Sequence, residues 1–142
     1  TMAQRWIPFY PAGGKCFQSA NDCATGHLLA MEKGRAGRRY LLGSHNHSYR
    51  EFMNMVAKVV GRRPPALKLP PAVAAAAGVA GRIGQRVDPH RFAGLDPHVL
   101  KSMSAFRYRR DDRAQNELGL KPEPIQLGIE RAYQWFLERD YC

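Results

Sequence analysis

The spacing of hydrophobic residues predicts helices over most of the chain. The clearest helix follows Ser48 and ends before Gly61, because apolar residues recur there on one helical face. Ser48 and Glu51 have the spacing of a capping box, in which hydroxyl and carboxylate each accept a hydrogen bond from the other residue's backbone amide. The same reasoning predicts further helices: one capped by Asn21 or Asp22 and ended by a left-handed Gly34, one over 71–86, one from 97 to 103, one capped by Asp111 or Asp112 and ended by Gly119, and one over 125–137.

Short extended segments are predicted between these helices. Residues 5–19 are rich in Pro and Gly, which oppose a helix and favour two extended pieces around a turn. Residues 39–43 carry a nearly continuous apolar run, which is typical of a strand inside a parallel sheet. Residues 66–69 are expected to form a brief extended link.

Length, apolar stretches and cysteine content indicate the number of domains, the absence of a predicted membrane span and the expected location. A chain of 142 residues is long enough for one compact domain. Its longest apolar stretch, 69–80, is interrupted by Pro and Gly and is shorter than the roughly 18 to 20 residues that a membrane-spanning helix needs. The three cysteines suit neither a disulfide framework nor paired zinc hooks, so a cytoplasmic location is expected. The chain starts at Thr1 without a secretory signal, which favours a fragment.

A strong positive charge is the most prominent feature of the composition. The 22 Lys and Arg exceed the 12 Asp and Glu, which gives a formal charge of +10. The arginines cluster at 38–39, 62–63 and 107–113, at the ends of predicted elements. Such clusters are either solvated element ends or, if they meet on one face, a surface for phosphate groups. No zinc-finger or RNA-binding motif accompanies them, which favours the first interpretation.

Two further patterns suggest ligand chemistry without supporting it. Gly78, Gly81 and Gly84 match a glycine spacing used in dinucleotide binding, but they follow helix-forming alanines rather than a strand. A close contact between helices explains them better. Cys23 and His27 are one helical turn apart but match no zinc pattern, so no metal site is predicted.

The order of motifs along the chain points to a family. The motifs are Ile7-Pro-Phe-Tyr-Pro-Ala-Gly-Gly14, Asn21-Asp-Cys-Ala-Thr-Gly-His-Leu-Leu-Ala30, Arg39-Tyr-Leu-Leu-Gly43 with Asn46 and Ser48-Tyr-Arg-Glu-Phe52, Gly61-Arg-Arg-Pro-Pro65, and Asp112-Arg-Ala-Gln-Asn-Glu-Leu-Gly-Leu-Lys-Pro122 before Trp135-Phe136. In this order they resemble the carboxy-terminal half of extended short-chain dehydrogenase/reductases, the NAD-dependent epimerase/dehydratase family, and within it the dihydroflavonol-reductase-like bacterial members. The resemblance spans nearly the whole chain and is strongest over 22–65 and 108–136.

The resemblance implies an α/β fold. Residues 1–142 would form a single, mostly helical substrate lobe with a few short strands, and these would complete a Rossmann-type sheet whose main part is absent from this chain. It also implies an amino-terminal half that binds NAD or NADP through a Gly-rich turn and supplies a Tyr-x-x-x-Lys pair. No Tyr of this chain has a Lys four residues later. The chain alone is therefore expected to have no catalytic residue and to bind no cofactor.

The expected function is the substrate-binding portion of an NAD(P)-dependent reductase or epimerase that acts on a carbonyl or sugar-like substrate. Phe9 and Tyr10 are expected to line the substrate site, and Arg109 is expected to bind an anionic group of the substrate. The alternative is that the two aromatic side chains pack within the fold and that Arg109 is solvated. Phe17-Gln18-Ser19 departs from the Phe, Val and then His or Asp of many relatives, so no role is assigned there. The alternative function is a small basic module for nucleic acid or phosphorylated ligands.

Expected partners are the missing amino-terminal half, a small-molecule substrate and a second copy of the chain, since an excised lobe exposes apolar surface. Neither a membrane nor nucleic acid is expected as a partner.

Overall fold

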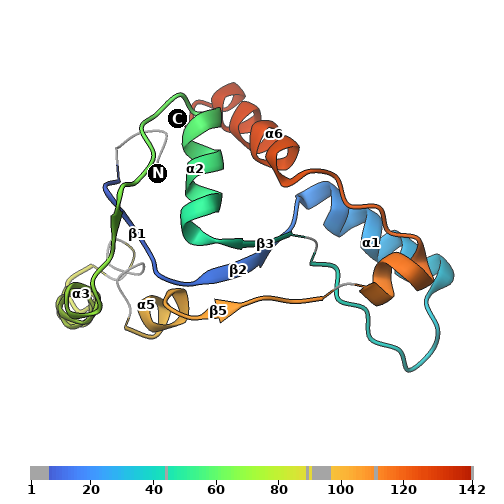
Figure 1. Ribbon diagram of the computed structural model, residues 1–142, viewed down its shortest axis with the longest axis horizontal. Coiled ribbons are helices and arrows are strands. Elements are labelled where there is room, and N and C mark those ends of the chain that lie inside the picture. The colour runs from blue at the N-terminus through green and yellow to red at the C-terminus, as the bar shows by residue number, and fades with distance from the viewer. Residues whose placement is uncertain (1–6, 44, 89, 91–96, 111, 142) are drawn as a thin grey trace.

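A three-stranded sheet runs through the middle of the molecule, and a two-stranded sheet lies beside it (Figure 1). The computed structural model describes residues 7–43, 45–88, 90, 97–110 and 112–141. In the larger sheet, β2 (Gly14–Phe17) pairs antiparallel with β3 (His45–Ser48) and parallel with β5 (Phe106–Arg107). In the smaller sheet, β1 (Phe9–Tyr10) pairs parallel with β4 (Leu67–Lys68).

Helices pack in pairs around these sheets. The helices are α1 (Ala20–Lys33), α2 (Tyr49–Val59), α3 (Pro71–Gly84), α5 (Pro97–Met103), the π-helical turn η2 (Ala114–Leu118) and α6 (Ile125–Glu138). α1 packs on η2, α2 on α6, and α3 on α5. The α1 and η2 pair and the α3 and α5 pair lie at opposite ends of the molecule (Figure 1). The fold is α/β with short strands, as expected.

The capping box predicted from the sequence is present at the start of α2. The Ser48 hydroxyl accepts a hydrogen bond from the Glu51 amide at 3.2 Å, and Glu51 Oε2 accepts one from the Ser48 amide at 2.8 Å. Two hydrogen bonds from Ser48 lower the pKa of the Glu51 carboxyl. The one from the Ser48 amide has the larger effect, and the one from the Ser48 hydroxyl has the next largest. The predicted stop is also confirmed, because Gly61 follows α2 with a φ of +66°.

The two predicted ends of α1 are wrong in detail. The N-cap of α1 is Ser19, whose Oγ accepts from the Asp22 amide at 3.0 Å, rather than Asn21 or Asp22. Gly34 ends α1 with a φ of −66°, so it is not left-handed.

The segment leading into η2 differs as well. Asp111 lies outside the described residues, and Asp112 pairs with Arg110 instead of capping the helix. The left-handed Gly119 at the end of η2, with a φ of +74°, is as predicted.

The strand predicted over 39–43 is wrong. The structure has no strand at these residues; the strand beside β2 is formed by His45–Ser48, immediately before the capping box. β3 pairs with all four residues of β2, whereas β5 pairs only with Gly14 and Lys15. Gly43 lies against Cys16 of β2, since a Cβ at Gly43 would be 2.5 Å from Cys16 Sγ, but the 39–43 segment forms no strand there. The side chains of this segment still alternate between core and solvent. Tyr40 and Leu42 pack on the core, whereas Leu41 is 52% exposed.

The hydrophobic core is small and lies between α1, the 39–43 segment and η2. Its buried members are Ala114, Leu118 and Leu120. Gly26 of α1 lets Leu42 approach closely, since a Cβ at that position would lie 2.7 Å from Leu42 Cδ2. Leu29 and Ala30 of α1, together with Tyr40 and Leu42, cover this core.

Gly13 joins three segments of the chain. Its amide donates to the Met103 carbonyl at 3.1 Å, and its carbonyl accepts from the Tyr49 amide at 3.0 Å. A Cβ at this buried position would overlap the carbonyl oxygen of Ala105. Only Gly therefore allows the segment before β5 to run this close to the start of β2.

Candidate functional site

Phe9 and Tyr10, the predicted substrate walls, lie in β1. Phe9 is 39% exposed, and the guanidinium of Arg50 lies 5.6 Å from the centre of the Tyr10 ring. This is within the range of a cation–π contact. Tyr10 is therefore held from α2, while Phe9 keeps an accessible face.

Arg109, the predicted anionic anchor, follows β5. Its backbone is fixed by Asn46 of β3, which accepts from the Arg109 amide at 2.9 Å and donates to the Arg109 carbonyl at 2.7 Å. The exposed guanidinium donates to the Tyr108 carbonyl at 3.1 Å. The side chain is thus presented at the surface by a well-anchored backbone.

The three predicted residues do not form one cluster. Lys15 is paired with Arg107 in the parallel ladder, so Arg109 lies near the carboxyl end of β2. Phe9 and Tyr10 precede the amino end of that strand and pair with β4 instead. A ligand that touched all three would have to extend along the whole of β2.

An apolar cavity that sequence reasoning missed lies between the start of α1, α2 and α6. We call it the α1–α6 cavity; its volume is about 490 Å³. Its apolar wall is built from side chains of β2, α2 and α6: Phe17, Phe52, Ile125, Ile129, Ala132, Trp135 and Phe136. Phe17 stacks on Phe52 with ring centres 3.8 Å apart, which fixes one side of the cavity. Apolar residues of the helix predicted over 125–137 therefore line a hollow rather than a closed core.

Gln18 supplies a polar group to this apolar surrounding. It lines the cavity, and its Nε2 atom is buried without a hydrogen-bond partner among the described residues. A buried donor that is not satisfied lowers the stability of a fold, and a carbonyl or hydroxyl oxygen of a ligand would satisfy it. The only sequence signal was the departure from the family pattern at Phe17-Gln18-Ser19.

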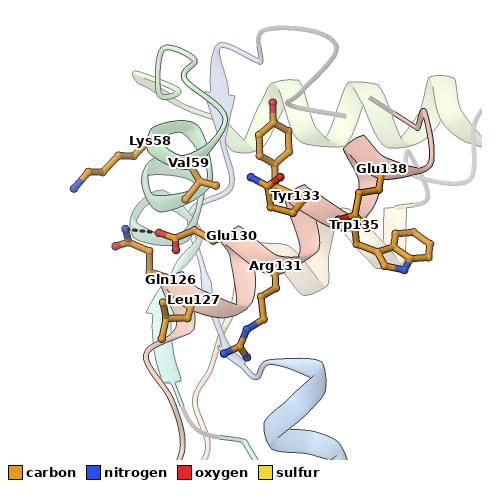
Figure 2. A pocket seen from close by; sticks show the side chains of 10 residues that line it. Lys58, Val59, Gln126, Leu127, Glu130, Arg131, Tyr133, Trp135 and Glu138 are labelled. Atoms are coloured by element: carbon orange, nitrogen blue, oxygen red, sulfur yellow. Dashed lines mark hydrogen bonds between the residues drawn. The ribbon is translucent and has the colours of Figure 1, made fainter.

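A second, more open hollow lies beside α6, and its lining residues are shown in Figure 2. Its volume is about 860 Å³, and Lys58, Glu130, Arg131 and Glu138 give it mixed charge. In this hollow, Gln126 Nε2 donates a hydrogen bond to Glu130 Oε1 at 3.1 Å. The mixed charge and open shape make it less suited to an apolar ligand than the α1–α6 cavity.

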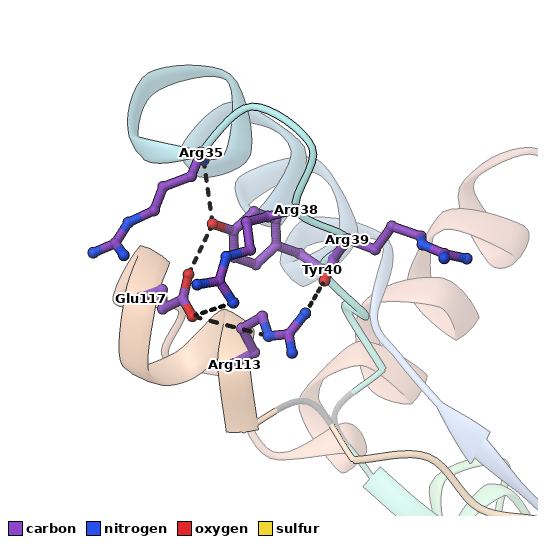
Figure 3. A network of polar contacts seen from close by, with 6 residues as sticks. All are labelled: Arg35, Arg38, Arg39, Tyr40, Arg113 and Glu117. Atoms are coloured by element: carbon purple, nitrogen blue, oxygen red, sulfur yellow. Dashed lines mark hydrogen bonds and ion pairs between the residues drawn. The ribbon is translucent and has the colours of Figure 1, made fainter.

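Two of the three arginine clusters meet around one carboxylate, Glu117 (Figure 3). Glu117 accepts a hydrogen bond from the Tyr40 hydroxyl at 3.0 Å, and it lies 4.0 Å from Arg38 and 3.9 Å from Arg113. Arg113 also donates to the Arg39 carbonyl at 3.2 Å. These contacts use the arginines to hold the loop after α1 on η2. They favour a structural role over a phosphate-binding face.

The glycine pattern in α3 does not fit a dinucleotide phosphate. Gly78, Gly81 and Gly84 lie inside the helix rather than at a strand-to-helix turn, and Gly78 and Gly81 are buried. Amides inside a helix are committed to its own hydrogen bonds and cannot cradle a phosphate. The glycines thus belong to a packed helix, which agrees with the interpretation favoured from the sequence, a contact between helices.

Cys23 and His27 lie together on α1. His27 Nδ1 is 2.7 Å from the Cys23 carbonyl oxygen and 3.8 Å from its Sγ. In the part of the chain that the structure describes, no group of three or more His, Cys, Asp or Glu side chains could hold a metal ion. His45 and His47 belong to β3.

None of the helices in the described part of the chain combines the length and the apolar character needed to cross a bilayer.

The chain is similar in sequence to two bacterial proteins. It is 28% identical over 138 residues to sterol demethylase protein B of Methylococcus capsulatus, a match that covers 95% of this chain and 41% of that protein. It is 26% identical over 156 residues to a Synechocystis protein named as a candidate dihydroflavonol 4-reductase, covering 97% of this chain and 41% of that protein. No protein-family model matches.

A solved structure has the same fold. The crystal structure of a nucleoside-diphosphate-sugar epimerase from Pseudomonas aeruginosa matches with a TM-score of 0.72 at 26% identity. The match covers 95% of this chain and 39% of that one. The chain thus spans about two fifths of the length of the relatives it matches.

Proposed function

We propose that this chain, which corresponds to the carboxy-terminal part of an epimerase/reductase-like protein, supplies the substrate side of an NAD(P)-dependent enzyme. The observation that carries the proposal is the extent of the matches: nearly all of this chain aligns, but with only about 40% of each relative. In the proposal, NAD or NADP binds to another part of the protein. The cytoplasmic location favoured by the cysteine content belongs to the same proposal.

The proposed substrate carries a carbonyl or sugar-like group. Support comes from the α1–α6 cavity, whose wall is mostly apolar and whose buried donor, Gln18 Nε2, suits an oxygen acceptor. These properties favour an apolar carbonyl compound over a sugar, because sugar hydroxyls would lose their hydration against apolar side chains. Phe9, Tyr10 and Arg109 are retained as proposed contacts to more distant parts of the substrate.

Enzyme assays of two polypeptides test this function. The coding sequence upstream of Thr1 should encode a Gly-rich turn and a Tyr-x-x-x-Lys pair. The longer polypeptide should oxidise or reduce a nicotinamide cofactor, and the purified 142-residue chain should not. Steady turnover by the 142-residue chain alone would contradict the proposal, and so would an upstream sequence that lacks both motifs.

Exposed apolar residues of α1 support a docking surface for the proposed partner, the amino-terminal part. Leu29 and Ala30 cover the core, while Leu28 and Met31, three residues apart, are 58% and 77% exposed. Neighbouring exposed apolar side chains are typical of a surface that contacts another protein part. Leu41 lies exposed in the neighbouring segment. We assign Leu28, Met31 and Leu41 to the docking surface for the rest of the protein.

Sedimentation velocity tests the docking surface. The 142-residue chain should self-associate and bind an apolar dye, and Leu28→Gln combined with Met31→Gln should reduce both. Leu127→Gln, at an exposed position of α6, is the matched control and should leave both unchanged. A monomeric chain without dye binding would contradict this assignment.

A further inference from the structure

Helix α3 exposes one apolar face at the end of the molecule away from α1 (Figure 1). Val79 and Ile83 are 61% and 62% exposed, and Val73 is 48% exposed. The opposite face, with Gly78 and Gly81, is buried. The exposed residues recur at helical spacing, so they form a continuous stripe; its members are Ala72, Val73, Ala76, Val79, Ala80 and Ile83, with Val87 just beyond the helix.

Positive side chains border this α3 stripe. Arg82 and Arg86 are exposed beside it, and Lys101 of α5 lines the same groove as Arg82. The α3 sequence from Pro71 to Gly84 contains no acidic residue. The face therefore combines exposed apolar side chains with three positive side chains, against which Asp88, just beyond the helix, sets one carboxylate.

We propose that the α3 stripe lies on the surface of an acidic membrane. From Val73 to Ile83 the stripe is about 15 Å long, which is half the hydrocarbon thickness, so the helix would rest in the interface rather than span it. Anionic headgroups supply the negative charge that Arg82, Arg86 and Lys101 would need. The earlier expectation of no membrane partner rested on the lack of a spanning stretch, and it does not apply to a helix that lies flat.

Charge favours a membrane over a second copy of the chain. Two α3 stripes packed face to face would bring the arginines of both copies into one interface. α3 itself has no carboxylate, and Asp88 just beyond it supplies one carboxylate against the two arginines of each copy. Burying unpaired like charges costs more than the apolar contact contributes, whereas a lipid surface leaves the guanidinium groups hydrated.

Cosedimentation of the 142-residue chain with vesicles tests the proposal. Binding is expected to vesicles of equal parts phosphatidylserine and phosphatidylcholine, weaker binding to phosphatidylcholine alone, and a decrease as salt rises. Val79→Asp combined with Ile83→Asp should lower binding at least about tenfold. Arg82→Ala and Arg86→Ala should each lower it about fivefold on the acidic vesicles. Circular dichroism should show that each variant keeps its helix content.

Leu127→Asp is the matched control, because Leu127 is also apolar and exposed but lies on α6. It should bind acidic vesicles as well as the original chain. An equal loss with Leu127→Asp would show general apolar adhesion and overturn the proposal. Absence of vesicle binding would overturn it as well, and so would a self-association that only the α3 variants abolish, since that would make the stripe an interface between copies.

Discussion

The hydroxyl of Tyr40 donates a hydrogen bond to Glu117 Oε2 at 3.0 Å and joins segments 77 residues apart. The same hydroxyl accepts from the Arg35 amide at 3.2 Å. One side chain thus ties the loop after α1 to η2, over the small core (Figure 3).

Replacing Tyr40 tests this connection. Tyr40→Phe keeps the ring in the core but removes both hydroxyl hydrogen bonds, so it should lower the free energy of unfolding by about 1 to 2 kcal/mol. Urea unfolding followed by circular dichroism measures the change. Tyr108→Phe, at a 44% exposed ring, is the control and should change stability by less than about 0.5 kcal/mol. Equal effects of the two substitutions would contradict the role of the hydroxyl.

The charge of Glu51 should make the start of α2 sensitive to pH. Its folded-state pKa is lowered from the usual 4.5, chiefly by the hydrogen bond from the Ser48 amide. A lowered pKa stabilises the folded state above the unfolded-state value, and this contribution is lost as pH falls through the folded-state pKa. Glu51→Gln keeps the capping geometry but loses the charge. It should cost about 0.5 kcal/mol near neutral pH, because an exposed capping interaction is weak.

Unfolding measured at neutral pH and again near pH 3 checks this sign. The difference between the original chain and Glu51→Gln should shrink at the lower pH, because the contribution of the Glu51 charge is lost as the carboxylate takes up a proton. A gap that stays constant with pH would refute the charge effect.

Gly13 should tolerate no side chain. In Gly13→Ala the new Cβ meets the Ala105 carbonyl, which is backbone and cannot turn away, so the 103–107 segment must separate from β2. We expect a loss of at least about 2 kcal/mol in the free energy of unfolding. Lys15→Ala, at an exposed position of the same strand, should have little effect. A Gly13→Ala variant as stable as Lys15→Ala would contradict this packing.

Arg109 should act through its guanidinium alone. Both hydrogen bonds between Asn46 and Arg109 use the Arg109 backbone, so Arg109→Ala leaves the local structure intact. In the longer, active polypeptide this variant should raise KM about tenfold with little change in kcat. Arg110→Ala, an exposed neighbour paired with Asp112, is the control. Unchanged steady-state kinetics in Arg109→Ala would remove Arg109 from the proposed substrate contacts.

Gln18 should lower the stability of the fold while strengthening substrate binding. Gln18→Leu removes a buried donor that lacks a partner, so the variant should be as stable as the original chain or more stable by about 1 kcal/mol. In the longer polypeptide it should weaken binding of an apolar carbonyl substrate about tenfold. Gln134→Leu, on the open side of α6, should change neither property. A marked loss of stability in Gln18→Leu would show that the amide has a structural partner.

The sequence by itself determined the helices and most of their ends. The capping box of Ser48 and Glu51 and the left-handed Gly119 depend on groups within a few residues of each other, so the local sequence contains the whole interaction. The order of motifs likewise indicated the relationship to epimerases and reductases.

Only the tertiary structure decided which apolar segment pairs with β2 and which face of α1 is buried. The 39–43 run is more hydrophobic than His45–Ser48, yet the latter forms the strand, and Tyr40 and Leu42 of the 39–43 run pack on the core instead. Leu28 and Leu29 are identical side chains, but only Leu29 covers the core. The α1–α6 cavity with the buried Gln18 amide, and the meeting of Arg38 with Arg113 at Glu117, arise in the same way. Each depends on segments far apart in the chain, whose contacts no local pattern can specify.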